Sequence, residues 1–458
     1  MAGLGAAPPA WSAKPAELLW AEPFVVRRGE TVALAVEGRR LPLAAQVAVF
    51  DEGRPDPSIT VLEWERPASR RGRLTIEIAA DAPVGLRGLE LRPAGGTRLL
   101  QTVAFRVADS ARLPWPHEPP GASASEREAL RDQVFIINNF GLYQASNLPA
   151  ESYFHDGLDI VLPKATPIYA LADGVVRDRF EPAVAGWRSI AVEDLDQPGF
   201  GWIYVHTDGF RHPVGDVVRR GEQIAEIADF DGSEHIHLSR AFVPDGRSWS
   251  RLQSHHNRFA DDLFELRDVE PPRIQGPLYL FRNQTGELLP ASDGELVATG
   301  DVDIVVAIRD GGHYAHSKDP AFPPSAGDRL APAVVRCEVL NSGGERVAQW
   351  TRDLTRMVLR WEESQSAIWA PERVMVVFKS HLEIPNAQYN SYFVLTNSDG
   401  INAGGEVQPT DTAYAWRTAA TDLAGERLFP DGRYRIRITA WDSVGNRSSR
   451  NQRVLVRN

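Results

Sequence analysis

The amino-acid sequence predicts a mainly β protein built from three domains. Its 458 residues are too many for one hydrophobic core, and a length of this kind is typical of about three domains. The 37 glycines and 33 prolines favour short strands joined by turns over long helices. Short segments of β type recur on both sides of a central block, which predicts two β-sandwich domains that flank a central antiparallel β domain.

The N-terminal part reads as a linker followed by a sandwich. Residues 1–19 are rich in Ala and Pro, as linkers are. Residues 20–110 contain four strand-like segments, TVALAVEG, AAQVAVFDEG, RLTIEIAADAPVG and TVAFRVADS, with the spacing of an immunoglobulin-like β-sandwich. A Pro-rich linker follows at 111–128, in which Ser125 is expected to cap a short helix.

Two further β-rich blocks complete the chain. The central domain is expected over 129–271, and a C-terminal β-sandwich over 272–458 with an insertion near 350–425. The closing segment GRYRIRITAW alternates apolar with polar residues, as a half-buried strand does, and resembles the last hairpin of bacterial immunoglobulin-like domains.

Composition excludes several classes of protein. A formal net charge of -11 argues against nucleic acid or an anionic membrane as a partner held by bulk electrostatics. The single cysteine, Cys337, rules out an intrachain disulfide and is expected at a buried strand position. No window approaches the ~18 apolar residues of a membrane span.

Histidines concentrate in the central block, where strand alternation predicts which of them share one face of a strand. Seven of the eleven histidines lie between 155 and 256. In EHIHLSR, alternation puts His235 and His237 on one face of a strand, opposite Ile236 and Leu238. In GWIYVHTDG, the same rule groups His206 with Tyr204 and Trp202. Two imidazoles on neighbouring positions of one face, roughly 6–7 Å apart, can share one site in different roles.

The stretch HDGLDI adds a possible partner for these rings. Alternation puts His155 and Asp159 on one side, while Leu158 and Ile160 face a core. A straight strand would separate the two polar residues by roughly 13 Å, and Gly157 is expected to permit the bend that brings them together. Imidazole nitrogen and carboxylate oxygen are zinc ligands, and catalytic zinc typically has three protein ligands.

These motifs carry a family resemblance. HDGLDI resembles the H-x-G-x-D signature of the lysostaphin-type (LytM-like) zinc endopeptidases, YVH resembles their Y-x-H strand, and GDVVRRGEQIAEIADFDGSEHIHLSR resembles the run that ends in H-x-H. The three motifs occur in the family's order over about 110 residues. By position, the resemblance implies that three residues are zinc ligands: His155, Asp159 and His237. It also implies that His206 and His235 form an unliganded catalytic pair.

The resemblance also implies a mechanism. One zinc ion per chain would polarise the scissile carbonyl and lower the pKa of its bound water toward ~7, while one histidine of the pair takes the proton and the other stabilises the oxyanion. Which histidine does which stays open. Tyr204 is a candidate substrate contact or a packing residue. Ser239 and Arg240 stand where the family usually has an aromatic and an acidic residue, which leaves the substrate preference open.

Two other functions compete with this interpretation. PIYALADGVVRD and GDVVRRGEQIAEI resemble halves of a biotinyl or lipoyl carrier barrel, but Lys164, the lysine of this block, precedes the strand and does not stand at a hairpin tip. A non-catalytic cell-wall-binding or scaffolding protein is the alternative, although such degenerate relatives usually lack a ligand or a catalytic histidine. Five further histidines are expected at the surface or in solvated loops: His212, His255, His256, His313 and His316.

The predicted function is therefore zinc-dependent hydrolysis of peptide bonds in bacterial peptidoglycan cross-links or stem peptides. The expected partners are peptidoglycan peptides, together with an envelope protein bound through the sandwiches. The stretch MAGLGAAPPAWSAKP lacks the basic and apolar regions of a signal peptide. The resemblance nevertheless implies an exported protein, periplasmic or extracellular.

Overall fold

The protein is mainly β, as the sequence predicts. The computed structural model describes residues 16–51, 53–94, 98–109, 113–131, 134–141, 143–144, 153–243, 249, 254–256, 268–283, 285–292, 294–311, 330–356, 358–360, 377–378, 392–396 and 415–458. Within these ranges one α-helix, α1 (Ala124–Arg131), accompanies the strands. No helix in the described part of the chain has the length and apolar character needed to cross a membrane.

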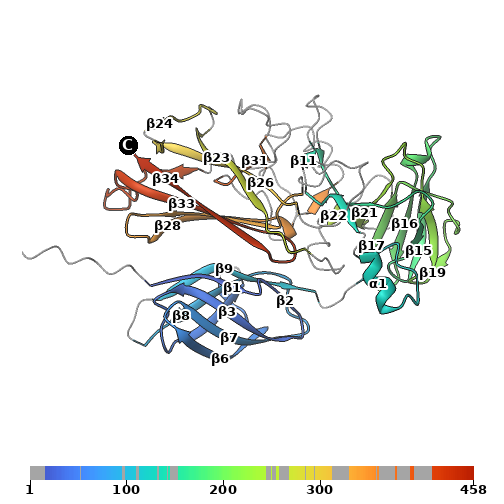
Figure 1. The fold of residues 1–458 in the computed structure, drawn as a ribbon, viewed down its shortest axis with the longest axis horizontal. Coiled ribbons are helices and arrows are strands. Elements are labelled where there is room, and N and C mark those ends of the chain that lie inside the picture. The colour runs from blue at the N-terminus through green and yellow to red at the C-terminus, as the bar shows by residue number, and fades with distance from the viewer. Residues whose placement is uncertain are drawn as a thin grey trace, which may run out of the picture.

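The N-terminal domain is a sandwich of two sheets that enclose their own core (Figure 1). One sheet has the order β1 (Glu17–Glu22), β3 (Thr31–Arg39), β7 (Arg71–Ile78), β6 (Ile59–Ala68). The other has the order β2 (Val25–Arg27), β9 (Leu99–Ala108), β8 (Gly85–Arg92), β4 (Gln46–Asp51), β5 (Arg54–Pro55). Alternation explains the core: in β7, Leu74, Ile76 and Ile78 are buried between more exposed neighbours.

Helix α1 in the linker begins two residues earlier than a cap at Ser125 would place it. The backbone N–H of Glu126 donates to Ser123 Oγ at 3.3 Å, and the Ser123 N–H donates to the Glu126 carboxylate at 2.8 Å. This reciprocal pair is a capping box. The prediction of Ser125 as the cap was therefore wrong, because the carboxylate that completes the box lies three residues after Ser123.

The central domain is organised by one antiparallel sheet (Figure 1). Its order is β10 (Phe135–Asn138), β13 (Leu158–Val161), β21 (His235–Phe242), β17 (Phe200–Val205), β16 (Ser189–Asp194), β15 (Gly174–Phe180), β19 (Val217–Val218). A smaller sheet and a strand pair lie beside it: β14 (Pro167–Tyr169), β20 (Gln223–Ile227) and β18 (Thr207–Asp208), and β11 (Tyr143–Gln144) with β12 (Tyr153–Phe154). A short 3-10 turn, η2 (Ala185–Trp187), precedes β16.

The C-terminal domain contains two further sheets. The first has the order β23 (Arg273–Arg282), β26 (Asp301–Arg309), β31 (Tyr392–Val394), β30 (Val377–Phe378), with β32 (Trp416–Arg417) also on β26. The second has the order β24 (Ala291–Ser292), β25 (Glu295–Ala298), β34 (Arg447–Val456), β33 (Gly432–Trp441), β27 (Val334–Leu340), β28 (Arg346–Asp353). Cys337 is buried in β27, as expected. Much of the segment near 350–425 lies outside the described residues.

The central and C-terminal domains are joined through strands and core. β22 (Ser254–His256) pairs with β21 and also with β29 (Val358–Arg360), so a strand from beyond residue 350 extends the central sheet. One cluster of buried apolar side chains runs from the central sheet into the C-terminal domain, including Ile136, Leu158, Leu330 and Val335. These two parts of the chain are therefore packed together as one body.

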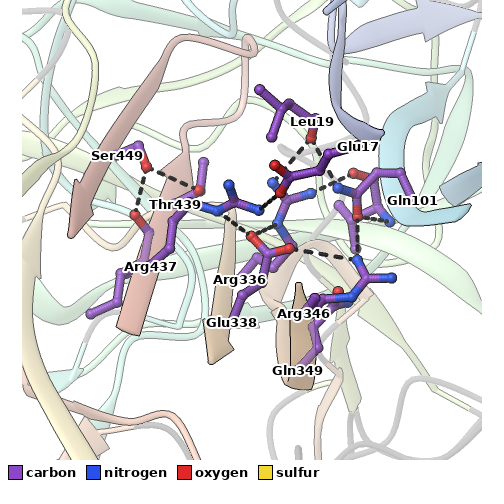
Figure 2. Close-up of polar contacts among 12 residues, drawn as sticks. Glu17, Leu19, Gln101, Arg336, Glu338, Arg346, Gln349, Arg437, Thr439 and Ser449 are labelled. Atoms are coloured by element: carbon purple, nitrogen blue, oxygen red, sulfur yellow. Dashed lines mark hydrogen bonds and ion pairs between the residues drawn. The ribbon is translucent and has the colours of Figure 1, made fainter. Parts of the chain in front are cut away.

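The two sandwiches meet at a polar interface (Figure 2). Arg336, fully buried in β27, donates to the carbonyls of Val103 at 2.9 Å and Leu19 at 3.3 Å. Its partner Glu338 also accepts from Arg437 at 2.8 Å. Domains far apart in sequence thus share a buried network of charges.

Candidate metal centre and catalytic site

Three side chains meet at one point beside the two central strands β13 and β21. His155 lies in the loop before β13, Asp159 within β13, and His237 directly opposite Asp159 on β21. His155 Nε2 lies 3.1 Å from Asp159 Oδ1, and His237 Nδ1 lies 3.0 Å and 2.9 Å from these two atoms. The structure therefore brings together all three residues that the sequence predicts as metal ligands.

Neighbouring groups determine which atoms of these ligands face one another. The Asn139 carbonyl oxygen lies 3.2 Å from His155 Nδ1, and because a carbonyl only accepts, Nδ1 carries the proton. His155 Nε2 is left with its lone pair, on the side of Asp159. The Asn138 side chain donates to Asp159 Oδ2 at 2.6 Å, which leaves Oδ1 for the two rings. Outer hydrogen bonds of this kind orient metal ligands and fix their tautomers.

His237 is held between two carboxylates. Its Nδ1 faces Asp159, while its Nε2 lies 3.1 Å from Asp156 Oδ1 and 2.9 Å from Ser239 Oγ. Burial alone would lower the pKa of His237, but the hydrogen bonds to Asp156 and Asp159 raise it to about 10. Conversely, burial opposes ionisation of Asp159, but the two histidines hold its pKa well below the ordinary value. The surroundings of His237 thus favour positive charge on its ring.

This donor set fits a zinc ion. Two imidazole nitrogens and one carboxylate oxygen all lie within 4.8 Å of one another, and His155 and Asp159 are buried. Donor atoms about 3 Å apart can share one ion with bonds of about 2.0–2.2 Å, and three protein ligands leave a fourth position open, as in catalytic zinc sites.

The two remaining predicted residues, His206 and His235, lie beside the three ligands. Their ring centroids are 4.4 Å apart, and His235 Nε2 lies 3.8 Å from Asp159 Oδ1. The Nδ1 atoms face the carbonyls of Gly186 and Ser233, so in both rings Nδ1 donates and Nε2 is the free nitrogen. Burial lowers the pKa of both histidines, that of His206 to about 4, so that both rings are neutral at pH 7.

Strand alternation explains the faces of β13 and β21 but not that of His206. Register pairs Tyr204 with Leu238 and Val205 with His237, so a continued β17 would turn residue 206 toward the core. The strand instead ends at Val205, and His206 adopts a left-handed backbone conformation with φ of 61°. This turn sends the ring to the metal side of the sheet.

The predicted grouping of His206 with Trp202 and Tyr204 is corrected accordingly. Tyr204 is completely buried among apolar side chains, and its hydroxyl accepts a hydrogen bond from the Leu171 N–H at 3.0 Å. Trp202 belongs to the same core. Tyr204 is thus a packing residue and not a substrate contact, because no part of it reaches the surface.

Gly157 has a steric reason to be glycine. A Cβ at this position would lie 2.7 Å from His237 Nε2 and from the Leu238 carbonyl oxygen, and 2.8 Å from Ser239 Oγ. Its φ is not in the left-handed region. The expected bend arises instead because β13 starts only at Leu158, so that His155 lies outside the strand, and glycine permits the close approach of β21.

Several neighbours of the site could not be assigned from sequence. Asp156 is part of HDGLDI, but its contact with His237 depends on a strand about 80 residues away. Trp187, from η2, and Phe230 approach the His206 ring with centroid distances of 5.4 Å and 4.6 Å. Trp187 is 56% exposed and borders the His206 ring on the solvent side. No spacing pattern in the chain indicates these contacts.

Among the histidines predicted at the surface, His212 has its ion-pair partners outside this cluster. His212 is partly exposed, with its ring nitrogens 3.7 Å from Asp216 and 3.6 Å from Glu222. His255 and His256 form part of β22. His313 and His316 lie outside the described residues. Lys164 lies in the turn between β13 and β14, paired with Asp229, and so does not stand at a hairpin tip.

A second group of acidic residues has an explanation in local structure. Ligand atoms of Asp268, Asp310 and Asp442 lie within 4.8 Å of one another in the C-terminal domain. Asp442 Oδ1 accepts the backbone N–H groups of residues 444–446 at 2.7–3.0 Å, and its carboxylate therefore fastens the turn between β33 and β34.

A known protein family matches the central domain. Residues 153–248 match the model of peptidase family M23, and this range contains all five site residues. This segment is similar to the peptidase family M23. The lysostaphin-type resemblance of the three sequence motifs is thereby confirmed at the level of the family.

Solved structures with similarity to part of this chain include two peptidase-related catalytic domains and one protein complex. The catalytic domain of lysostaphin, an antimicrobial peptidase from Staphylococcus simulans, is 20% identical over 25% of this chain and 85% of that chain, with a TM-score of 0.22. A mutant catalytic domain of the prophage-encoded M23 protein EnpA from Enterococcus faecalis is 18% identical over 28% and 87%, with a TM-score of 0.21. The SpoIIQ–SpoIIIAH pore-forming complex matches at 18% identity over 28% and 83%, with a TM-score of 0.21.

Proposed function

We propose that the protein is a zinc-dependent endopeptidase that hydrolyses peptide bonds in the cross-links or stem peptides of bacterial peptidoglycan. One observation carries this proposal: three potential ligands converge on one point, and two further histidines beside them present their free Nε2 atoms. A degenerate binding domain has no need for the second pair. An exported protein, acting in the periplasm or outside the cell, would have access to this substrate.

In this proposal His155, Asp159 and His237 hold one zinc ion per chain. When bound, the ion supplies a Lewis acid for the scissile carbonyl and acidifies the attacking water. The ion together with its three ligands keeps a net positive charge, because only one ligand is a carboxylate. Asp159 accepts from Asn138, and His155 donates to Asn139, so that the ligands are oriented before the ion arrives.

The chain's own histidines move the proton. Each ring of the pair donates from Nδ1 to a carbonyl, so when neutral it offers a lone pair at Nε2 and can take a proton from water. A ring that has taken a proton becomes an Nε2–H donor, able to stabilise an oxyanion or to protonate the leaving amine. His206 and His235 can therefore exchange roles as base and acid within one cycle, without a change of tautomer at Nδ1.

The decisive experiment is mass spectrometry of peptidoglycan fragments after digestion with the zinc-loaded protein. We expect His206→Ala and His235→Ala to retain about one zinc per chain and to lose turnover by about 10²–10⁴-fold. Asp159→Ala should lose both metal and turnover, whereas His212→Ala, a histidine outside the cluster, should keep both. Loss of zinc in His206→Ala or His235→Ala would contradict the assignment of ligands.

The alternative function is non-catalytic binding to the cell wall or to an envelope protein through the flanking sandwiches. The same digestion separates the two proposals. Protein that cosediments with intact peptidoglycan but releases no fragments, with zinc fully bound, would overturn the enzymatic proposal in favour of the binding one.

A further inference from the structure

Asn139 connects the metal centre to the C-terminal domain. It follows directly after β10, and its side-chain amide bonds to the backbone of Ala331, 192 residues further along the chain. Nδ2 donates to the Ala331 carbonyl at 2.9 Å, and Oδ1 accepts the Ala331 N–H at 2.9 Å. One side chain thus satisfies both backbone groups of a single residue in another domain, as a neighbouring strand would.

The segment that receives these bonds is fixed within the C-terminal domain. Leu330 and Asp310 exchange backbone hydrogen bonds of 2.8 Å and 3.0 Å, and the Leu354 N–H donates to the Ala333 carbonyl at 2.9 Å. Leu330 and Ala331 are 2% and 3% exposed. Asn139 is therefore tied to a rigid, buried support and not to a solvated loop.

On its other side Asn139 holds a metal ligand. Its backbone carbonyl accepts the Nδ1–H of His155, and two residues later the Gly141 N–H donates to the His155 carbonyl at 2.8 Å. The preceding residue, Asn138, donates to Asp159. The position of the 138–141 segment thus sets the orientation of two of the three ligands.

We propose that the C-terminal domain supports the geometry of the metal centre. Asn139 is the positioning residue through which Ala331 of that domain holds His155 in place. The inference rests on the metal-binding part of the proposed function. Without the two bonds to Ala331, the 138–141 segment loses its fixed support, and the His155 ring has to be ordered when the ion binds. The affinity for zinc then falls by the free energy of that ordering.

The test compares zinc affinity in full-length protein, measured by competition with a chromophoric chelator. Asn139→Ala removes both bonds to Ala331 and keeps the backbone carbonyl that His155 uses. We expect its dissociation constant for zinc to rise about 10-fold or more, within the range for outer hydrogen-bond partners of metal ligands. Asn341→Ala is the matched control, because Asn341 also donates and accepts side-chain bonds, but in an exposed turn between β27 and β28.

Two readouts separate positioning from general destabilisation. The thermal unfolding midpoints of the metal-free proteins report fold integrity, and NMR of the His155 Nδ1–H reports its bond to Asn139. The proposal expects faster solvent exchange of this proton in Asn139→Ala. Zinc affinity equal to wild type in a folded Asn139→Ala protein would overturn the inference and leave the proposed function intact. Wild-type protein that binds no zinc would instead overturn the proposed function.

Discussion

At the scale of single residues, the chemistry of the site depends on which ring nitrogen of each histidine already makes a hydrogen bond. His155, His206 and His235 all donate from Nδ1 to a backbone carbonyl, whereas His237 turns Nδ1 toward Asp159. Backbone carbonyls thus determine the tautomers of His155, His206 and His235, whereas two carboxylates determine the orientation of the His237 ring. The same residue type can therefore serve as ligand or as base, because the backbone around it determines the free nitrogen.

Asp156 offers a direct test of this principle. Its carboxylate lies 3.1 Å from His237 Nε2 and, as an acceptor, keeps the proton on that nitrogen, so that Nδ1 is the nitrogen that gives up its proton when zinc binds. Asp156→Asn weakens this preference because an amide can also donate. We expect the dissociation constant for zinc to rise by about 10–100-fold. Asp229→Asn, which changes an exposed aspartate paired with Lys164, should bind zinc as wild type does, and a similar value for both variants would contradict this role.

At the scale of elements, the strand ladders account for what sequence could predict about the site. Period-2 alternation assigned the faces of β13 and β21 correctly, because both are central strands with buried partners on each side. Alternation failed for His206, where the strand ends and the backbone turns left-handed. Asp156 and Asn139 act through partners about 80 and 192 residues away, and local patterns hold no information on such contacts.

The linker before the central domain contains a titratable group that the site does not use. His117 is 7% exposed, its Nδ1 has no hydrogen-bond partner among the described residues, and burial lowers its pKa from 6.5 to about 4. The folded state therefore keeps the ring neutral while the unfolded chain takes up a proton below pH 6.5. The stabilisation from this group is present above pH 6.5 and is lost as the pH falls toward 4.

This shift predicts a specific pH dependence of stability. When the pH is lowered from 7 to 5, the buried ring should reduce the free energy of unfolding by about 2 kcal/mol. His117→Gln cannot titrate, so its stability relative to wild type should improve by about that amount over the same interval. Chemical unfolding at the two pH values measures the difference, with a chelator present so that metal binding does not contribute. A difference that stays constant with pH would refute the prediction.

At the scale of the whole molecule, the two sandwiches are joined into one support for the central domain. Phe24 of the N-terminal sandwich stacks on Trp441 of the C-terminal one at 4.7 Å, next to the charged network of Figure 2. The C-terminal domain in turn contacts the central domain through Ala331, which bonds to Asn139, and through β29, which extends the central sheet. The N-terminal sandwich is therefore linked to the central domain through the C-terminal one.

The charged network itself is testable at Glu338, the carboxylate that faces three arginines. It lies 3.3 Å from Arg336 and 3.5 Å from Arg346, and it accepts from Arg437 at 2.8 Å. Burial opposes its ionisation, but Arg336 and Arg437 hold the pKa of Glu338 below the ordinary 4.5. Its contribution to stability is therefore present above pH 4.5 and is lost as the pH falls further.

Glu338→Gln leaves the buried Arg336 without a charged partner, so we expect a loss of about 3–5 kcal/mol of unfolding free energy at pH 7. Glu295→Gln is the control, because its partner Arg433 is 77% exposed and such pairs contribute at most about 1 kcal/mol. Urea unfolding followed by tryptophan fluorescence measures both, since Trp441 lies at this interface. Equal stabilities for the two variants, or a Glu338→Gln deficit that does not shrink below pH 4.5, would show that the network does not hold the sandwiches together.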